Sequence, residues 1–381
     1  MHLNIQDAER LAKALAKANA AIPSKGESSV LETAMLLQTE ADQLSIVATD
    51  MSSHQMKLSV PAQILIPGAV LIGGDYFSKL VNRLGNKPLV LQMNHSQLVI
   101  TNSESGSHKF ELFQGEPDDF PQDFDMPPVA ATVDADALAE ALKAVLIAAT
   151  GVEQEICFQG KDNVLFISTG EYIVTRSRMA LTEMNTEFCF AVPRSTLAGS
   201  RLPEFSGPVQ IHVSPNKIVF SQNSDHLLIR RLCPEPDVDY VHTVLDVLPI
   251  GRIVVSLQQL KNRAHIIAGG KPSCVLRLRG KTDTKLIITG DRKGYGSSAM
   301  PIAIQGDVSG TTPEIQLDIN LLEKAIKTID GEDAVIDWVD VHGDRQSISL
   351  RLSNDANPEK RQTLLLPLQK KDDEEEEDQS S

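Results

Sequence analysis

The sequence has few of the residues that mark a catalytic or metal-binding protein. Its 381 residues include only four cysteines, Cys157, Cys189, Cys233 and Cys274, which lie far apart and form no Cys-x-x-Cys pair. That spacing favours buried, reduced thiols. The nine histidines are scattered without metal-ligand spacing, and no Gly-x-Ser-x-Gly motif is present. The sequence therefore predicts no metal, no cofactor and no catalytic centre.

Aromatic residues and long apolar runs are also scarce. Aromatic residues make up 4% of the chain, with a single tryptophan, so the core must be built mainly from Leu, Ile, Val and Ala. No apolar run approaches the ~18 residues that a membrane-spanning helix needs. Met1 leads directly into the polar residues Asp7, Glu9 and Arg10. We therefore expect a cytoplasmic protein without a signal segment or a membrane span.

Positive charge is in deficit, and the excess negative charge is unevenly placed. The formal net charge is −15, of which residues 371–381, with one Lys and seven Asp or Glu, contribute −6. This tail is predicted to be disordered because it has no apolar surface to bury. DNA phosphates should repel such a chain overall, so any role on nucleic acid requires a locally basic surface.

What the sequence does contain is a repeat of domain size. The apolar stretch Leu44–Asp50 ends in a polar turn, and the same pattern returns at Val164–Gly170 and at Lys285–Asp291. The intervals are 120 and 121 residues, counted between the last residues of these stretches. A constant period of this length indicates one domain-sized unit used three times.

The other predicted elements keep the same order in each repeat. Helices are predicted at Gln6–Asn19, Asp75–Leu84 (with Asp75 as N-cap), Asp134–Ala149, Arg194–Leu202, Leu257–Ala268 and Asp318–Ile329. In the first repeat, strands are predicted at Val30–Gln38, Leu44–Ala48, Gln55–Val60, Ile64–Ile72, Leu89–Met93, Gln97–Thr101 and Phe110–Phe113. Pro- and Asp-rich connections follow at Gly115–Pro128 and Cys233–Tyr240. The expected fold is α+β, with two helices packed on antiparallel sheet in each of the domains 1–127, 128–248 and 249–370.

Two short motifs have some features of binding sites. Gly269-Gly-Lys-Pro-Ser resembles a phosphate-binding loop, but Ala264 and Pro272 replace required residues, so a helix C-terminal turn is favoured. Asp337, Asp340, His342 and Asp344 cluster near a hairpin tip and could suggest a hard cation. A solvated turn between strands is the favoured reading.

Basic residues on the predicted helices are the remaining functional signal. For one helix a solvated face is the default reading, but a repeated fold would bring six helices to one side. A shared basic surface of this kind suits sequence-independent contact with the backbone of duplex DNA. The predicted DNA-binding residues are Arg10, Lys13, Lys17, Lys25, Lys79, Arg83, Lys143, Arg194, Arg201, Lys261, Arg263, Lys324 and Lys327.

With this repeat in place, the chain resembles the bacterial DNA polymerase III beta subunit, the DNA sliding clamp family. The matching pieces are Ile46–Asp50, Phe110–Pro121, Ala191–Arg194, Pro236–Tyr240 and Leu364–Leu368, in order within residues 1–370. The resemblance implies three clamp domains per chain and a ring-shaped head-to-tail homodimer. Such a ring encircles duplex DNA and tethers the polymerase as a non-enzymatic processivity factor.

The resemblance also implies a pocket for short linear motifs of the DNA polymerase, the clamp loader and repair factors. Carried over by position, it uses Ser168, Gly170, Tyr172, Ile173, Val238, His242, Leu364, Leu365, Leu366, Pro367 and Leu368. This sequence departs from the family there, with Glu171-Tyr172 in place of a His-Arg pair, Val238 in place of Pro, and an acidic tail after the last strand.

Two other functions are compatible with a repeated fold of this kind to different degrees. A diverged clamp-fold scaffold or paralogue would bind partners without encircling DNA, and would not need the basic helix residues. An enzyme on a repeated fold is disfavoured because the sequence shows no catalytic site.

Overall fold

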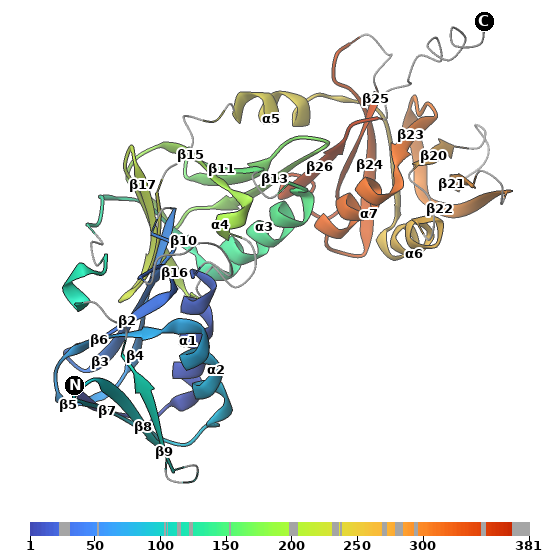
Figure 1. The fold of residues 1–381 in the computed structure, drawn as a ribbon. Coiled ribbons are helices and arrows are strands. Elements are labelled where there is room, and N and C mark those ends of the chain that lie inside the picture. Colours follow the sequence, from blue (N-terminus) through green and yellow to red (C-terminus); the bar gives the residue numbers. More distant parts are fainter. Residues whose placement is uncertain are drawn as a thin grey trace, which may run out of the picture. The chain divides into compact units, whose positions relative to one another are not determined.

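The computed structural model describes residues 1–22, 31–51, 53–102, 104, 106–112, 116–121, 125–151, 154–197, 205–230, 236, 238–268, 273–278, 285–292, 296–343 and 348–367 (Figure 1). Lys25, Arg201, Leu368, the Gly269–Pro272 loop and the acidic tail lie outside these residues. The chain divides into two compact units. Unit 1 comprises 1–138, 160–163 and 180–235, and unit 2 comprises 139–159, 164–179 and 236–381.

Unit 1 contains two antiparallel sheets and the helices α1 (Ala8–Ala20) and α2 (Gly74–Arg83). The smaller sheet has the order β5 (Gln63–Ile66), β1 (His2–Ile5), β7 (Leu89–Asn94), β8 (Gln97–Asn102) and β9 (Gly106–Glu111). The larger has the order β14 (Glu183–Met184), β10 (Val129–Asp134), β16 (Pro208–Val213), β17 (Lys217–Gln222), β18 (Asp225–Arg230), β4 (His54–Pro61), β3 (Gln43–Thr49), β2 (Ala34–Glu40) and β6 (Ala69–Gly73). The unit also holds β15 (Phe188–Pro193), α4 (Arg194–Leu197), and the 3₁₀ turns Leu31–Thr33 and Pro117–Asp119.

Unit 2 is built on one long antiparallel arrangement. Its strand order is β11 (Glu155–Lys161), β12 (Val164–Thr169), β13 (Ile173–Ala180), β26 (Arg361–Leu365), β25 (Ile348–Asn354), β24 (Asp333–Asp340), β19 (Pro249–Ser256), β22 (Gly296–Gly310), β21 (Lys285–Arg292), β20 (Ser273–Leu278) and β23 (Ile315–Asp318). Its helices are α5 (Val238–Leu245), α6 (Leu257–Ala268) and α7 (Ile319–Thr328), while α3 (Ala135–Ala148) is divided between the two units.

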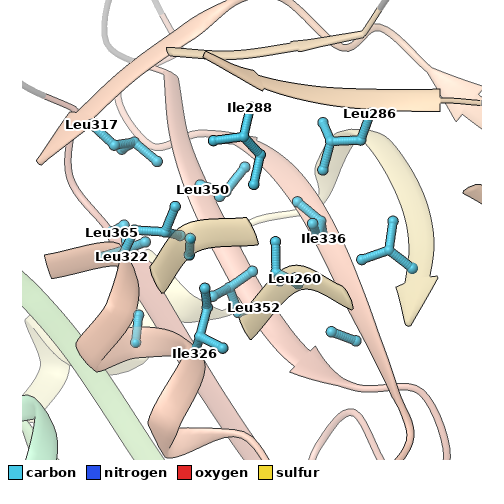
Figure 2. Packing of buried hydrophobic residues seen from close by; sticks show 14 of the residues in the cluster. Leu260, Leu286, Ile288, Leu317, Leu322, Ile326, Ile336, Leu350, Leu352 and Leu365 are labelled. Carbon is cyan, nitrogen blue, oxygen red and sulfur yellow. The ribbon is translucent and has the colours of Figure 1, made fainter. Parts of the chain in front are cut away.

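The largest described core cluster lies in unit 2, where α6 and α7 pack on the sheet (Figure 2). Leu260 from α6 and Leu322 and Ile326 from α7 lie against strand residues such as Ile288 and Leu350. Fully burying each such side chain contributes ~1.5–3 kcal/mol. The aliphatic core expected from the scarcity of aromatics is therefore what holds both helices against the sheet.

The helices begin where local capping chemistry allows. Asp7 accepts a hydrogen bond from the Arg10 backbone at the start of α1, and Asp318 accepts from two backbone N–H groups at the start of α7. The prediction of Asp75 as the N-cap of α2 is wrong. Gly73 occupies that position. Asp75 lies in the first turn of the helix, where the negative charge of a carboxylate interacts favourably with the helix dipole.

Several element boundaries also differ from those predicted. The run Ile64–Ile72 is two strands, β5 and β6, because Pro67-Gly68 interrupts it. The first predicted strand starts at Ala34, after a 3₁₀ turn, and β22 extends to Gly310. The sequence pattern predicts neither α5, at the second connection, nor the strands β1, β10 (Val129–Asp134), β14, β19 (Pro249–Ser256) and β23.

The first connection packs on the larger sheet of unit 1. Phe120 is buried against Leu36 and Val47. The Gln55 side chain donates to the Pro121 carbonyl, the His212 ring meets the Pro127 carbonyl at 2.7 Å, and Lys217 binds Asp125 at 3.0 Å. The described part of this Pro- and Asp-rich segment is therefore structural rather than a loose linker.

The same strand pairing occurs once in each unit. In unit 1, β18 pairs with β4, with His226 opposite Lys57. In unit 2, β26 pairs with β13, with Gln362 opposite Arg176. In each case the last strand of one predicted repeat, β18 or β26, pairs with a strand of the preceding repeat. That partner, β4 or β13, is the third strand after the first helix of its own repeat. The two remaining strands of this series are β9, at the end of its sheet, and β22.

Candidate functional site

The described basic residues of the predicted DNA-binding set lie on six helices. They are Arg10, Lys13 and Lys17 on α1, Lys79 and Arg83 on α2, Lys143 on α3, Arg194 on α4, Lys261 and Arg263 on α6, and Lys324 and Lys327 on α7. All are exposed or half-buried, while the apolar stripes of α1, α2, α6 and α7 are buried. α1 packs beside α2 in unit 1, and α6 beside α7 in unit 2. Each pair therefore presents its own basic face.

Two of these lysines are paired with carboxylates one turn away. Lys13 lies 2.8 Å from Glu9, and Lys79 lies 2.6 Å from Asp75. All four side chains are exposed, so these pairs are weak and screened by salt. A phosphate oxygen can replace either carboxylate at little cost.

A hollow of about 230 Å³ separates the two helices of unit 2. Lys261 of α6 and Lys327 of α7 line it, together with His265, whose Nδ1 lies 3.0 Å from Glu323. The hollow thus carries two ammonium groups from two different helices, an arrangement that suits an extended anion such as a nucleic-acid backbone.

The α3 helix is less basic than the other helices, as its sequence indicates. It carries Glu140, which binds Lys360 at 2.9 Å and the buried Arg361 at 3.1 Å. Arg361 also donates to the Thr328 carbonyl at the end of α7, so it joins α3 to α7. Glu140 therefore has a structural role, and its charge is balanced within unit 2.

A second candidate surface surrounds α5. Its residues Val238, Val241, Val244 and Leu245 are buried, the last three against Val174, Val339 and Leu364 of the sheet. Leu366, Val247 and Val341 pack on this cluster and remain partly exposed. The result is an apolar surface, open to solvent, formed by α5 and by the ends of β13, β24 and β26.

The structure separates the predicted pocket residues into core and surface. Ser168, Ile173, Val238, Leu364 and Leu365 are buried. Gly170 and Tyr172 are exposed, and His242, Leu366 and Pro367 are half-buried. The Leu366 backbone donates to the Tyr172 carbonyl, 3.4 Å away, and so brings the two chain segments together.

A polar network beneath this surface was missed from the sequence. Arg176 lies 2.6 Å from Asp246, 2.7 Å from Gln362 and 2.7 Å from Nδ1 of His242. The hydrogen bond from Arg176 holds the pKa of the Asp246 carboxyl below its usual value. The Nε2 atom of His242 lies 2.7 Å from Gln159. The network fixes α5 on the sheet, and its partners are too far apart in sequence to be paired by pattern.

Asp337 has a structural role as well. The prediction that it lies in a solvated turn is wrong, because Asp337 is a buried residue of strand β24. Asp337 is buried and binds Arg252 at 2.6 Å and Arg351 at 2.7 Å. Arg351 also donates to the Leu245 and Val247 carbonyls, which follow α5. The carboxylate of Asp337 is thus committed to guanidinium groups. Within the described residues, no group of His, Cys, Asp or Glu is placed to hold a metal ion, and none of the helices there is long and apolar enough to cross a membrane.

Comparison with known structures identifies the fold. A DNA polymerase III beta subunit from Thermotoga maritima superposes with a TM-score of 0.82 at 17% identity, over 97% of this chain and 99% of that one. The polymerase sliding clamp from Bacillus subtilis gives 0.83 at 14% identity, over 97% and 100%. The protein therefore has the α+β fold of the bacterial sliding clamps.

Sequence comparison takes the assignment one step further. Residues 1–125 match the family "DNA polymerase III beta subunit, N-terminal domain". A beta sliding clamp of Streptomyces coelicolor is 28% identical over 182 residues, and the matched stretch spans less than half of each protein, 48% of this chain and 44% of that one. Residues 1–125 are thus similar to the N-terminal domain of the DNA polymerase III beta subunit family, and the low identities are those of a divergent relative of the beta sliding clamps, in line with the resemblance found in the sequence.

Proposed function

We propose that the protein is a DNA sliding clamp that encircles duplex DNA as a head-to-tail homodimer of the domains 1–127, 128–248 and 249–370. The repeated pairing of β18 with β4 and of β26 with β13 carries the proposal. By the same rule, β9 of one copy should pair with β22 of a second copy. In a dimer of two copies, each β9 would pair with the β22 of the other copy, and the six repeats would form a closed ring.

The strands at the two ends support this assembly. β9 lies at the end of its sheet, and residues 296–303 of β22 pair with β21 on one side, with no described strand on the other. Exposed apolar side chains accompany both: Tyr76 lies 5.5 Å from the Phe110 ring of β9, and Ile266 is on α6, which packs on β22. Apolar groups beside an open strand edge are typical of an interface.

In such a ring the basic helix faces would contact DNA phosphates, and no base-reading contact is required. The surface around α5 would bind short linear motifs of the DNA polymerase, the clamp loader and repair factors. Both activities would require a cytoplasmic protein that works beside the replication machinery, and we include this location in the proposal.

Light scattering after gel filtration tests the dimer. We expect twice the 41.5 kDa mass of one chain. We would introduce proline at Ser107 and at His108 of β9, one at a time. One of these two residues points its backbone N–H away from β8, and replacing that residue should break the dimer. The other proline disturbs pairing with β8 and serves as the matched control. A monomeric wild-type protein would contradict the ring.

Retention on DNA tests encirclement. Protein loaded by the host's clamp loader and ATP should remain on nicked circular DNA and be lost when the circle is linearised. Equal retention on circular and linear DNA would show ordinary binding. A partner-binding activity unaffected by charge reversal of Lys79, Arg83 and Lys324, with no retention on circles, would support the diverged scaffold instead.

A further inference from the structure

The surface around α5 is continuous across three chain segments. A Cβ atom at Gly170 would lie 3.6 Å from Val241, so the main chain before β13 runs directly beside α5. The Leu366–Tyr172 hydrogen bond joins the end of β26 to the same place. Tyr172 and Tyr240 remain 59% and 46% exposed. These residues form one apolar surface that side chains of a bound peptide can contact.

Positive charge at this surface is turned inward. Arg176 is only 8% exposed, and its guanidinium is committed to Asp246, His242 and Gln362. Neither Lys nor Arg occurs in the segments 164–175, 238–248, 338–343 and 362–367 that form the surface, and Arg176 directly follows the first of them. No free cation from these segments is therefore available to an acidic ligand.

Negative charge faces outward beside the exposed tyrosines. Glu171 precedes Tyr172, Asp239 precedes Tyr240, and both carboxylates are exposed. Residues 371–381, which follow the last strand, add a net −6. An acidic segment, including this chain's own tail, meets like charge here, whereas a basic segment meets opposite charge.

We propose that this surface binds a partner peptide whose apolar anchors are flanked by lysine or arginine. The inference rests on the proposed peptide-binding role of the surface and adds the charge of its partner. Apolar side chains of the peptide contact Leu366, Val341 and the tyrosine rings, and its cations lie beside Glu171 and Asp239. The exposed carboxylates thus select among peptides that share the same anchors.

Fluorescence anisotropy with three labelled peptides tests this, using the full-length protein. The peptides share a Leu-Phe core and carry Lys, Gln or Glu on both sides. We expect the Lys peptide to bind tightest and the Glu peptide weakest, with a factor of about two to five for each carboxylate. The difference should shrink as salt is raised. Tyr172→Ser should weaken all three peptides alike.

Charge variants locate the effect. Glu171→Gln with Asp239→Asn should abolish the preference, and Glu171→Lys with Asp239→Lys should reverse it. Glu332→Gln, an equally exposed change before β24, is the matched control and should leave it intact. Equal affinities, a preference for the Glu peptide, or no binding at millimolar peptide would overturn the inference. So would truncation to residues 1–370 that tightens all three peptides alike, because the tail would then be the occupant.

The outcome is distinguishable from failure of the clamp function. A protein that prefers the Lys peptide but is not retained on circular DNA refutes encirclement alone. A protein that is retained on circles and shows no charge preference refutes this inference alone.

Discussion

Replacing Arg351 by methionine should be more destabilising than the same change at Arg252, although both bind Asp337. Arg351 is 5% exposed and makes two hydrogen bonds to Asp337 and two to the Leu245 and Val247 carbonyls. Removing it leaves a buried carboxylate short of a partner, which costs about 3–5 kcal/mol. The two carbonyls lose their donor as well.

Arg252 supplies the matched control. Its side chain is 46% exposed, and Arg351 still pairs the carboxylate when it is removed. Arg252→Met should therefore cost less, about 1–3 kcal/mol, mainly because Oδ1 of Asp337 loses the Nε donor of Arg252. The double variant Arg351→Met with Asp337→Leu removes the charge with its partner and should recover part of the loss.

The single tryptophan makes the measurement direct. Trp338 is fully buried beside Asp337 on β24 and donates to the Pro313 carbonyl at 2.8 Å. Its fluorescence in urea therefore follows unfolding of unit 2. A loss for Arg351→Met no larger than that for Arg252→Met would refute the reasoning.

Three further predictions concern charge. Burial lowers the pKa of His226 to about 4, so the unfolded chain takes up a proton at higher pH than the native one; stability measured by circular dichroism should fall from about pH 6.5 to pH 4, and His226→Gln should reduce that fall. Charge reversal at Lys79, Arg83 and Lys324 should shorten residence on circular DNA and flatten its salt dependence, without changing the dimer mass. Deleting residues 371–381 should leave the melting temperature unchanged, and a lowered value would show that the tail contributes to folding.

The order of helices and strands along the chain predicts the α+β class of the fold. Strands such as β3 combine apolar residues with turn residues at each end, and β3 was placed to within a residue at either end. α5 was missed although Val238, Val241 and Leu245 have helical spacing, because Pro- and Asp-rich residues precede them and β-branched residues are common within it. The local sequence predicts an irregular connection at this position. The helix is stabilised instead by packing of its apolar face against the sheet.

The candidate sites were predictable to different degrees. The basic helix residues follow from periodicity, since they lie outside the buried stripes of their helices. The surface around α5 depends on contacts between distant segments. Arg176 lies in an ordinary strand pattern, and its partner Asp246 is 70 residues away. No spacing rule pairs them, and only the antiparallel register of β13 with β26 brings Gln362 to the same guanidinium.

The recurrent strand pairing gives the chain the character of a bifunctional monomer. Each copy would carry one donor edge in β9 and one acceptor edge in β22. Adding a copy uses one edge of each kind and leaves one of each kind free, until the last free β9 pairs with the last free β22. Closure into a ring or growth into a filament then depends on the bend per repeat, which the strand edges themselves do not specify. A short peptide that imitates β9 would cap the acceptor edge and act as a chain terminator of assembly.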